Sequence, residues 1–188
     1  MDIASGILHG LSLQAPKGDT TRPTTIRSRQ ALFDSLGDLH GFTVVDLFAG
    51  SGALGLEAAS RGADSVFFVE GSKSVCRVIH QNCSRADALS PSAAFTTLNL
   101  TLPGGLARLT SNPRPDLIFA DPPYAESPKL LADMLADESF TAWAANALLI
   151  WETASDKGGL QPPPPTWKLE NIRIFGGAKF LFLRTVKS

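Results

Sequence analysis

Short apolar runs alternate with amphipathic stretches in the middle of the chain. The runs at 43–48, 65–69 and 94–98 predict strands, because each is only a few residues long and carries Val, Phe or Leu. Helices are expected between them, one ending before Gly62 as its C-cap and one at 73–85. Such alternation is typical of βαβ units, whose strands form a parallel sheet.

The second half of the chain continues this pattern. The apolar run at 117–120 suits a strand that is buried on both faces of a sheet, and a helix is expected at 128–136. A fifth strand at 147–151 precedes two closing strands at 172–175 and 180–183, which are joined by a two-glycine turn. The pattern therefore predicts an α/β, Rossmann-like fold. Its sheet has seven strands, is mostly parallel, and ends in an antiparallel hairpin.

The N-terminal part is patterned more loosely. Residues 1–25 are expected to form a small extension ahead of the main domain at 26–188, and period-two alternation at 11–13 suggests a β-hairpin. A helix is expected to begin at Pro23 or the threonines after it and to run to about Leu39.

Arg22, Arg27 and Arg29 form the most basic cluster of the chain. A charge cluster is usually a solvated helix face. Three arginines close together are also a plausible local footprint for phosphate groups. The sequence leaves these two interpretations about equal.

Bulk composition narrows the class of protein. The net charge of −1 over 188 residues gives no support for a nucleic-acid partner, but a local basic patch can suffice. No apolar run approaches the ~20 residues of a membrane span, and the N-terminus lacks the pattern of a signal peptide. Cys76 and Cys83 are too far apart along one helix to form a disulfide, and no spacing suggests a metal site. We therefore expect a cytoplasmic protein without a resident metal.

A glycine-rich turn follows the first predicted strand. Its spacing is Gly50-x-Gly52-x-x-Gly55, and Glu70 lies twenty residues beyond Gly50, as in a dinucleotide-binding turn. Asp46 argues against NAD, because its carboxylate would face the anionic pyrophosphate. S-adenosylmethionine (SAM) carries an ammonium group, a sulfonium and no phosphate, so a nearby carboxylate is favourable. Each residue alone also fits a structural role, but together they favour SAM.

The sequence Asp121-Pro122-Pro123-Tyr124 stands directly after the strand at 117–120, at the edge where open α/β sheets bind ligands. An exocyclic base amine is a poor nucleophile, because its lone pair is delocalised into the ring. The Asp121 carboxylate and the Pro122 carbonyl would accept hydrogen bonds from such an amine and stabilise the tetrahedral nitrogen. Tyr124 would stack the base outside its helix. A rigid turn is the alternative for this stretch.

With these residues in view, the chain resembles a class I SAM-dependent methyltransferase. More closely, it is similar to the bacterial family that methylates the guanine exocyclic amine (N2) of 16S ribosomal RNA, the RsmD type. The resemblance covers nearly the whole chain and rests mainly on three pieces, namely Arg22-Pro23-Thr24-Thr25, the run at 46–55 with Glu57-Ala58 after it, and the stretch at 116–124.

The resemblance implies roles for particular residues. Donor binding would fall to Asp46, Phe48, Gly50, Gly52, Gly55 and Glu70, with Asn99 in place of the acid that normally follows the third strand. Catalysis would fall to Asp121, Pro122, Pro123 and Tyr124, and RNA contact to Arg22, Thr24, Arg27 and Arg29. The implied partner is ribosomal RNA within the assembled or assembling small subunit, and a monomer is expected.

The chain also departs from the family pattern. Ile26 and Gln30 stand where the family usually has acidic residues, and the stretch at 6–10 is less basic than the usual N-terminal hairpin. Two other functions stay open, a DNA adenine-N6 methyltransferase and a non-catalytic donor- or RNA-binding module. The short chain, without a separate target-recognition domain, argues against the first. The intact Asp121 and Tyr124 argue against the second.

Overall fold

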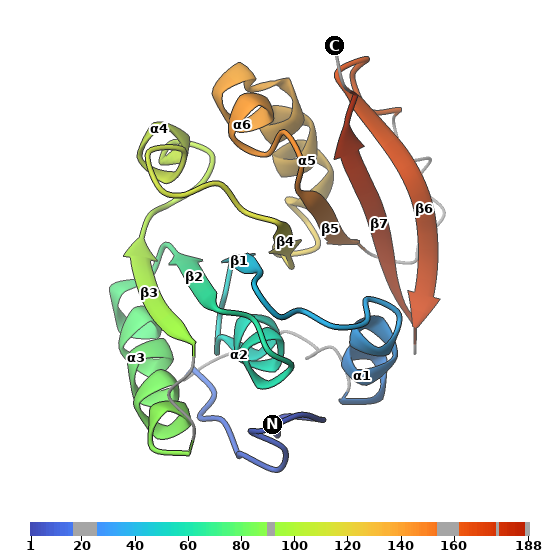
Figure 1. Ribbon diagram of the computed structural model, residues 1–188. Helices are drawn as coiled ribbons and strands as arrows, with labels where there is room; N and C mark the ends of the chain where they lie inside the picture. Colours follow the sequence, from blue (N-terminus) through green and yellow to red (C-terminus); the bar gives the residue numbers. More distant parts are fainter. Residues whose placement is uncertain (17–25, 90–92, 154–161, 176, 187–188) are drawn as a thin grey trace.

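The computed structural model describes residues 1–16, 26–89, 93–153, 162–175 and 177–186. Its centre is a seven-stranded sheet with the order β3-β2-β1-β4-β5-β7-β6 (Figure 1). The strands are β1 (Thr43–Leu47), β2 (Ser65–Glu70), β3 (Ala94–Asn99), β4 (Leu117–Ala120), β5 (Leu148–Thr153), β6 (Trp167–Phe175) and β7 (Ala178–Thr185). The first five strands in this order pair in parallel, whereas β7 is antiparallel to β5 and β6. The predicted fold class is confirmed.

Helices cover both faces of the sheet. Helices α1 (Ile26–Asp34), α2 (Ala53–Ser60) and α3 (Lys73–Asp87) share one apolar cluster with one face. Helices α4 (Leu106–Leu109), α5 (Ser127–Ala136) and α6 (Glu138–Trp143) share a second cluster with the other face. The sequence pattern did not predict α4 or α6, which are too short to show a clear period. No described helix is long and apolar enough to cross a membrane.

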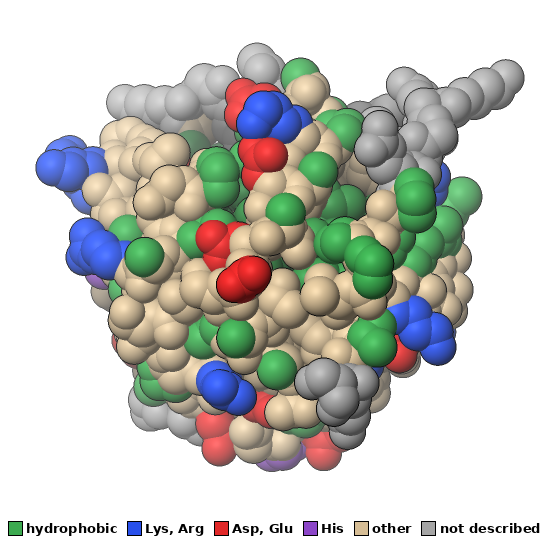
Figure 2. Space-filling model, turned by 90° about the horizontal axis from the view of Figure 1, so that it is seen from above, with side chains coloured by type: hydrophobic (Ala, Val, Ile, Leu, Met, Phe, Trp, Pro, Cys, Tyr) green, Lys and Arg blue, Asp and Glu red, His purple; other side chains and the backbone are tan. Residues whose placement is uncertain are grey.

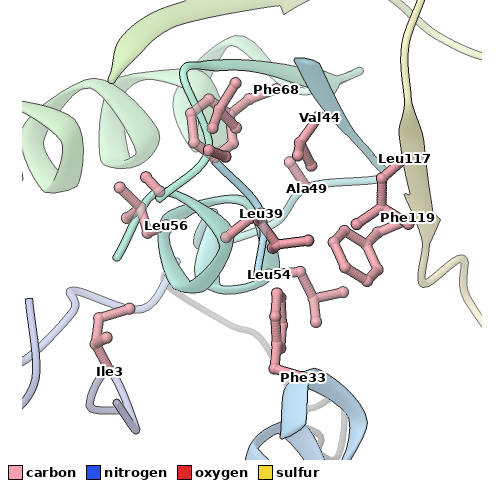
Figure 3. Packing of buried hydrophobic residues seen from close by; sticks show 14 of the residues in the cluster. Ile3, Phe33, Leu39, Val44, Ala49, Leu54, Leu56, Phe68, Leu117 and Phe119 are labelled. Atoms are coloured by element: carbon pink, nitrogen blue, oxygen red, sulfur yellow. The ribbon is translucent and has the colours of Figure 1, made fainter. Parts of the chain in front are cut away.

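Strand β4 is buried on both faces of the sheet, which explains why its sequence is a continuous apolar run. Leu117 and Phe119 point into the cluster beneath α1 and α2, close to Val44 and Leu54 in Figure 3. Ile118 and Ala120 point into the opposite cluster. Successive side chains of a strand alternate between faces, so a strand covered on both sides has no polar position.

Helix α1 ends at Asp34 and not near Leu39, so this part of the prediction was wrong. The Ser35 hydroxyl donates to the Leu32 carbonyl at 2.7 Å, and Gly37 has φ +79°, outside the helical region. Local hydrogen bonding and a left-handed glycine therefore stop the helix early. Its expected start at Pro23 lies outside the described residues.

Residues 1–16 pack closely against the main domain. The expected hairpin is present as a single antiparallel bridge between Asp2 and Ser12. Ile3 and Leu8 are buried in the cluster that contains α1–α3. The Ile7 amide donates to the Ser60 carbonyl at 2.9 Å, at the end of α2. The described part of the predicted extension is therefore integrated into the core by apolar contacts and hydrogen bonds.

The closing hairpin is longer than the apolar pattern predicted. Strand β6 begins at Trp167, five residues before the expected start, and its register shifts between Leu169 and Asn171. Such an irregularity breaks the period-two alternation on which a strand prediction depends. Of the two glycines expected in the turn, Gly177 has φ +89° and Gly176 lies outside the described residues.

Candidate active site

A cavity of about 510 Å³ opens at the carboxyl ends of β1, β2 and β4. It is lined by predicted residues of both motifs: Asp46, Phe48, Gly50, Glu70, Asp121, Pro122, Pro123 and Tyr124. Parallel pairing of β1 with β2 and with β4 brings the two motifs to one edge of the sheet. Two stretches that are distant in the sequence thus share one pocket.

The turn after β1 is held by the carboxylate of Asp46. Asp46 is 1% exposed, and its Oδ2 accepts a hydrogen bond from the Gly55 amide at 2.9 Å. Gly52 has φ +79° and forms the N-cap of α2. A Cβ on Gly55 would lie 2.4 Å from the Phe68 ring, so α2 packs on β2 too closely for a side chain there. Gly52 and Gly55 shape the turn from behind, and Gly50 faces the cavity.

Glu70 joins two loops at the same edge. Its Oε2 accepts a hydrogen bond from the Gly50 amide at 3.2 Å, and its Oε1 accepts one from the Ser72 amide at 2.8 Å. The glycine turn and the turn before α3 are therefore fixed to one carboxylate. Charge-assisted hydrogen bonds of this kind are stronger than neutral ones, so the geometry of the turn is set before any ligand arrives.

Negative charge gathers in the cavity. Burial raises the pKa of Asp46 well above its ordinary value, and the nearby carboxylates of Asp121 and Glu70 raise it further against the opposing Gly55 amide. Figure 2 shows acidic side chains near the middle of one face, with most Lys and Arg side chains toward its margin. Carboxylates that repel one another are stabilised by a cationic ligand.

The stretch 121–124 connects β4 to α5. The Pro123 carbonyl accepts hydrogen bonds from the amides of Glu126 and Ser127, at 3.0 and 3.1 Å, and so forms the turn into the helix. Tyr124 is 43% exposed, and its hydroxyl donates to Glu152 Oε1 at 3.1 Å. An aromatic ring is therefore presented at the rim of the cavity, close in sequence to Asp121.

The family described as "Conserved hypothetical protein 95" matches residues 1–184. The chain belongs to this family. Relatives named "Ribosomal RNA small subunit methyltransferase D" include the Escherichia coli K12 protein, 30% identical over 176 residues that cover 93% of this chain and 84% of the relative. The Haemophilus influenzae protein of the same name is 33% identical over 176 residues, covering 93% and 88%. The resemblance inferred from the motifs is confirmed.

Solved structures agree with this relationship. A hypothetical protein of Thermus thermophilus is 27% identical, with a TM-score of 0.73 and a coverage of 99% of both chains. Methyltransferases share the same architecture, and one of them, 16% identical and thus informative about the fold alone, was solved in complex with SAH. The chain therefore has the class I fold of SAM-dependent methyltransferases.

Asn99 lies outside the cavity, at the end of β3. Its side-chain nitrogen donates to the carbonyls of Glu70 and Gly71, at 2.9 and 2.8 Å. The amide group thus holds the turn after β2, whereas Thr101 and Leu102 line the cavity beyond it. These bonds use the amide hydrogens of Asn99, whereas the acid that Asn99 replaces can only accept hydrogen bonds, a role for its side-chain oxygen. The expected contact of Asn99 with SAM therefore stays a prediction.

The arginine cluster is divided by the structure. Arg27 is exposed, whereas Arg29 is 1% exposed and pairs through Nε with Glu57 Oε2 at 3.3 Å. Arg29 thus lies in the interior and contributes to the lining of the cavity, and its expected contact with RNA phosphate stays a prediction. A fully buried carboxylate such as Glu57 requires an internal cation, and Arg29 and Arg61 both pair with it. Arg22 and Thr24 lie outside the described residues.

Two buried residues contact residues of the cavity lining, and the sequence pattern gave neither of them a role. Glu152 is 1% exposed and contacts Tyr124, and its only signal was a charged residue directly after the apolar run of β5. Asn82 is fully buried in α3 and donates to the Ser51 carbonyl at 2.9 Å. Ser51 belongs to the glycine turn, so α3 supports that turn. A lone polar residue on the apolar side of a helix could have indicated this role.

Proposed function

We propose that this protein transfers the methyl group of SAM to the exocyclic amine (N2) of a guanine in 16S ribosomal RNA. One observation carries the proposal. The acidic pocket of Asp46 and Glu70 and the stretch 121–124 open into the same cavity, so donor and acceptor would meet there. The choice of ribosomal RNA as the substrate rests on the names of the relatives. The protein would act in the cytoplasm on small subunits.

The residues of the cavity fit SAM. Its ammonium and sulfonium groups are cationic, and the raised pKa of Asp46 reports a buried carboxylate with further carboxylates nearby. Asp46 and Glu70 would hold the polar end of the donor and its ribose hydroxyls, along the glycine turn. Phe48 and Leu102 offer apolar surface in the same cavity. When bound, SAM supplies an electrophilic methyl group.

The acceptor side would prepare the amine for attack. The Asp121 carboxylate and the Pro122 carbonyl would accept the two N2 hydrogens, which favours the tetrahedral nitrogen of the transition state. The Pro123 carbonyl is already used in the turn to α5, so Pro122 is the main-chain acceptor of choice. Tyr124, half exposed at the rim, would stack on the guanine and lower the cost of holding it unpaired.

A tritium-transfer assay tests the proposal. Purified protein and labelled SAM are mixed with small ribosomal subunits from a strain without the corresponding methylase, with naked 16S RNA, and with duplex DNA. We expect label in ribosomal RNA, and mass spectrometry of RNA digests should locate it on guanine N2. Label in DNA adenine would favour the alternative function, and folded, SAM-binding protein that labels no RNA would contradict the proposal.

A matched pair of variants makes the assay specific. Asp121→Asn keeps the shape of the side chain and removes its charge, so transfer should fall steeply. Glu170→Gln makes the same type of change on β6, where Glu170 pairs with Arg184 at 3.3 Å. It should transfer label at the rate of the natural protein.

A further inference from the structure

The hydroxyl of Tyr124 is hydrogen-bonded to a buried carboxylate. Tyr124 is 43% exposed and belongs to the irregular stretch between β4 and α5, whereas Glu152, which accepts the hydrogen bond from its hydroxyl at 3.1 Å, is 1% exposed. One end of this hydrogen bond is thus in the packed interior and the other is at the rim of the cavity. The fixed partner is Glu152.

The sheet explains why Glu152 can serve as an anchor. Ala120 of β4 is in register with Trp151 of β5, so Asp121 and Glu152 follow as the next residues along these two neighbouring strands. Trp151 Nε1 donates to the Ser127 hydroxyl at 2.8 Å, and that hydroxyl donates to the Glu152 carbonyl at 3.4 Å. The start of α5 and the end of β5 are thereby fastened together around Glu152.

We propose that Glu152 is a positioning residue that sets the angle of the Tyr124 ring against the target base. The inference rests on the proposed methyl transfer. A tyrosine in an irregular segment has two rotatable side-chain bonds, and stacking a base on it requires both to be fixed. A hydrogen bond from its hydroxyl to a buried carboxylate fixes the far end of the ring, and a charged acceptor strengthens that bond. Phenylalanine would offer the same face without the anchor.

Three single variants and one double variant test the inference with the full-length protein, SAM and small subunits. Tyr124→Phe and Glu152→Ala should each lower kcat by about tenfold, as expected for one hydrogen bond to a charged group. The KM for subunits and the Kd for SAM should stay within about twofold, because each variant keeps an aromatic ring at position 124 and leaves the SAM pocket unchanged. Glu152→Gln should recover most of the activity, since its amide oxygen still accepts the hydroxyl.

The double variant Tyr124→Phe with Glu152→Ala is decisive. If both residues act through one bond, the double variant is no slower than either single variant. Independent effects that multiply to about a hundredfold, or a Tyr124→Phe protein with the natural kcat, would overturn the inference. If Glu152→Ala fails to fold, the kcat of Tyr124→Phe still decides, because that variant leaves the buried carboxylate in place.

Two controls separate this inference from the proposed function. Glu170→Ala, on β6, should leave kcat unchanged and reports any general cost of removing a glutamate. The natural protein is assayed first. If it labels no small subunits, the proposed function fails. If it does label them while Tyr124→Phe is fully active, only the role of Glu152 fails.

Discussion

The two halves of the cavity are built differently. On the donor side, Asp46 is buried and the carboxylates of Asp46 and Glu70 accept hydrogen bonds from backbone amides, so internal hydrogen bonds already hold the backbone of that half. On the acceptor side, Tyr124 is 43% exposed, and its hydroxyl is hydrogen-bonded to the side chain of Glu152 in β5. A small donor of constant shape suits a preformed pocket, whereas one base of a large substrate needs an open rim. The difference therefore reflects the two kinds of ligand expected there.

The largest expected effect comes from the acceptor half. Asp121→Ala should lower methyl transfer by about 10³-fold, since removal of one preorganised group that stabilises a transition state costs about 10²–10³. The Kd for SAM, measured by calorimetry, should change little, because the donor half keeps its backbone hydrogen bonds. A large loss of SAM binding would mean that the two halves are not separable.

A substitution in the donor half should mainly weaken SAM binding. Asp46→Asn should weaken SAM binding by about 10- to 100-fold, because a charge-assisted contact contributes about 1.5–3 kcal/mol. The same variant should also change how the free energy of unfolding depends on pH. The pKa of Asp46 is raised above 3.8 in the folded protein, so its ionisation opposes folding as pH rises through the raised value.

Urea unfolding of the donor-free protein at several pH values measures this second effect. Asp46 should lower the free energy of unfolding of the natural protein as pH rises from about 3.8, and the Asn variant should lack this contribution. If the free energy of unfolding of the two proteins depended on pH in the same way, burial would not raise the pKa of Asp46.

A smaller effect is expected where α3 supports the glycine turn. Asn82 exchanges two hydrogen bonds with the backbone of Gln14, at 2.9 and 3.0 Å, and donates to Ser51. Asn82→Ala should lower the free energy of unfolding by about 1–3 kcal/mol and raise the Kd for SAM about fivefold, as expected for lost buried hydrogen bonds. Asn171→Ala, on β6, serves as the control. Unchanged SAM binding in a destabilised Asn82→Ala protein would limit Asn82 to folding.

The smallest effect is expected at the exposed arginine of α1. Arg27→Ala should weaken binding of small subunits only about two- to threefold and should lower the dependence of affinity on salt by about one phosphate contact. The Kd for SAM should not change. Filter binding at several salt concentrations measures the affinity for subunits and its salt dependence. An unaltered salt dependence would assign Arg27 to a solvated helix face.

The parallel strands could be predicted because burial on both faces selects apolar residues at nearly every position. A strand covered on both faces, such as β4, is apolar throughout, and the rule that ligands bind at the carboxyl edge then placed Asp46 and Asp121 together. The glycine turn was readable for a similar reason, since its conformation depends on residues that are adjacent in the sequence.

The remaining features depend on partners that are distant in the sequence. Arg29 looked like a surface cation until Glu57, 28 residues away, gave it a buried partner. The sequence pattern indicated only that Glu152 follows the apolar run of a strand. Its contact with Tyr124 also spans 28 residues. Local pattern therefore determined the sheet, the glycine turn and the position of the stretch 121–124 at the end of β4. The tertiary structure decided which charges are buried and which side chain holds Tyr124, because burial and pairing arise only when separate elements pack together.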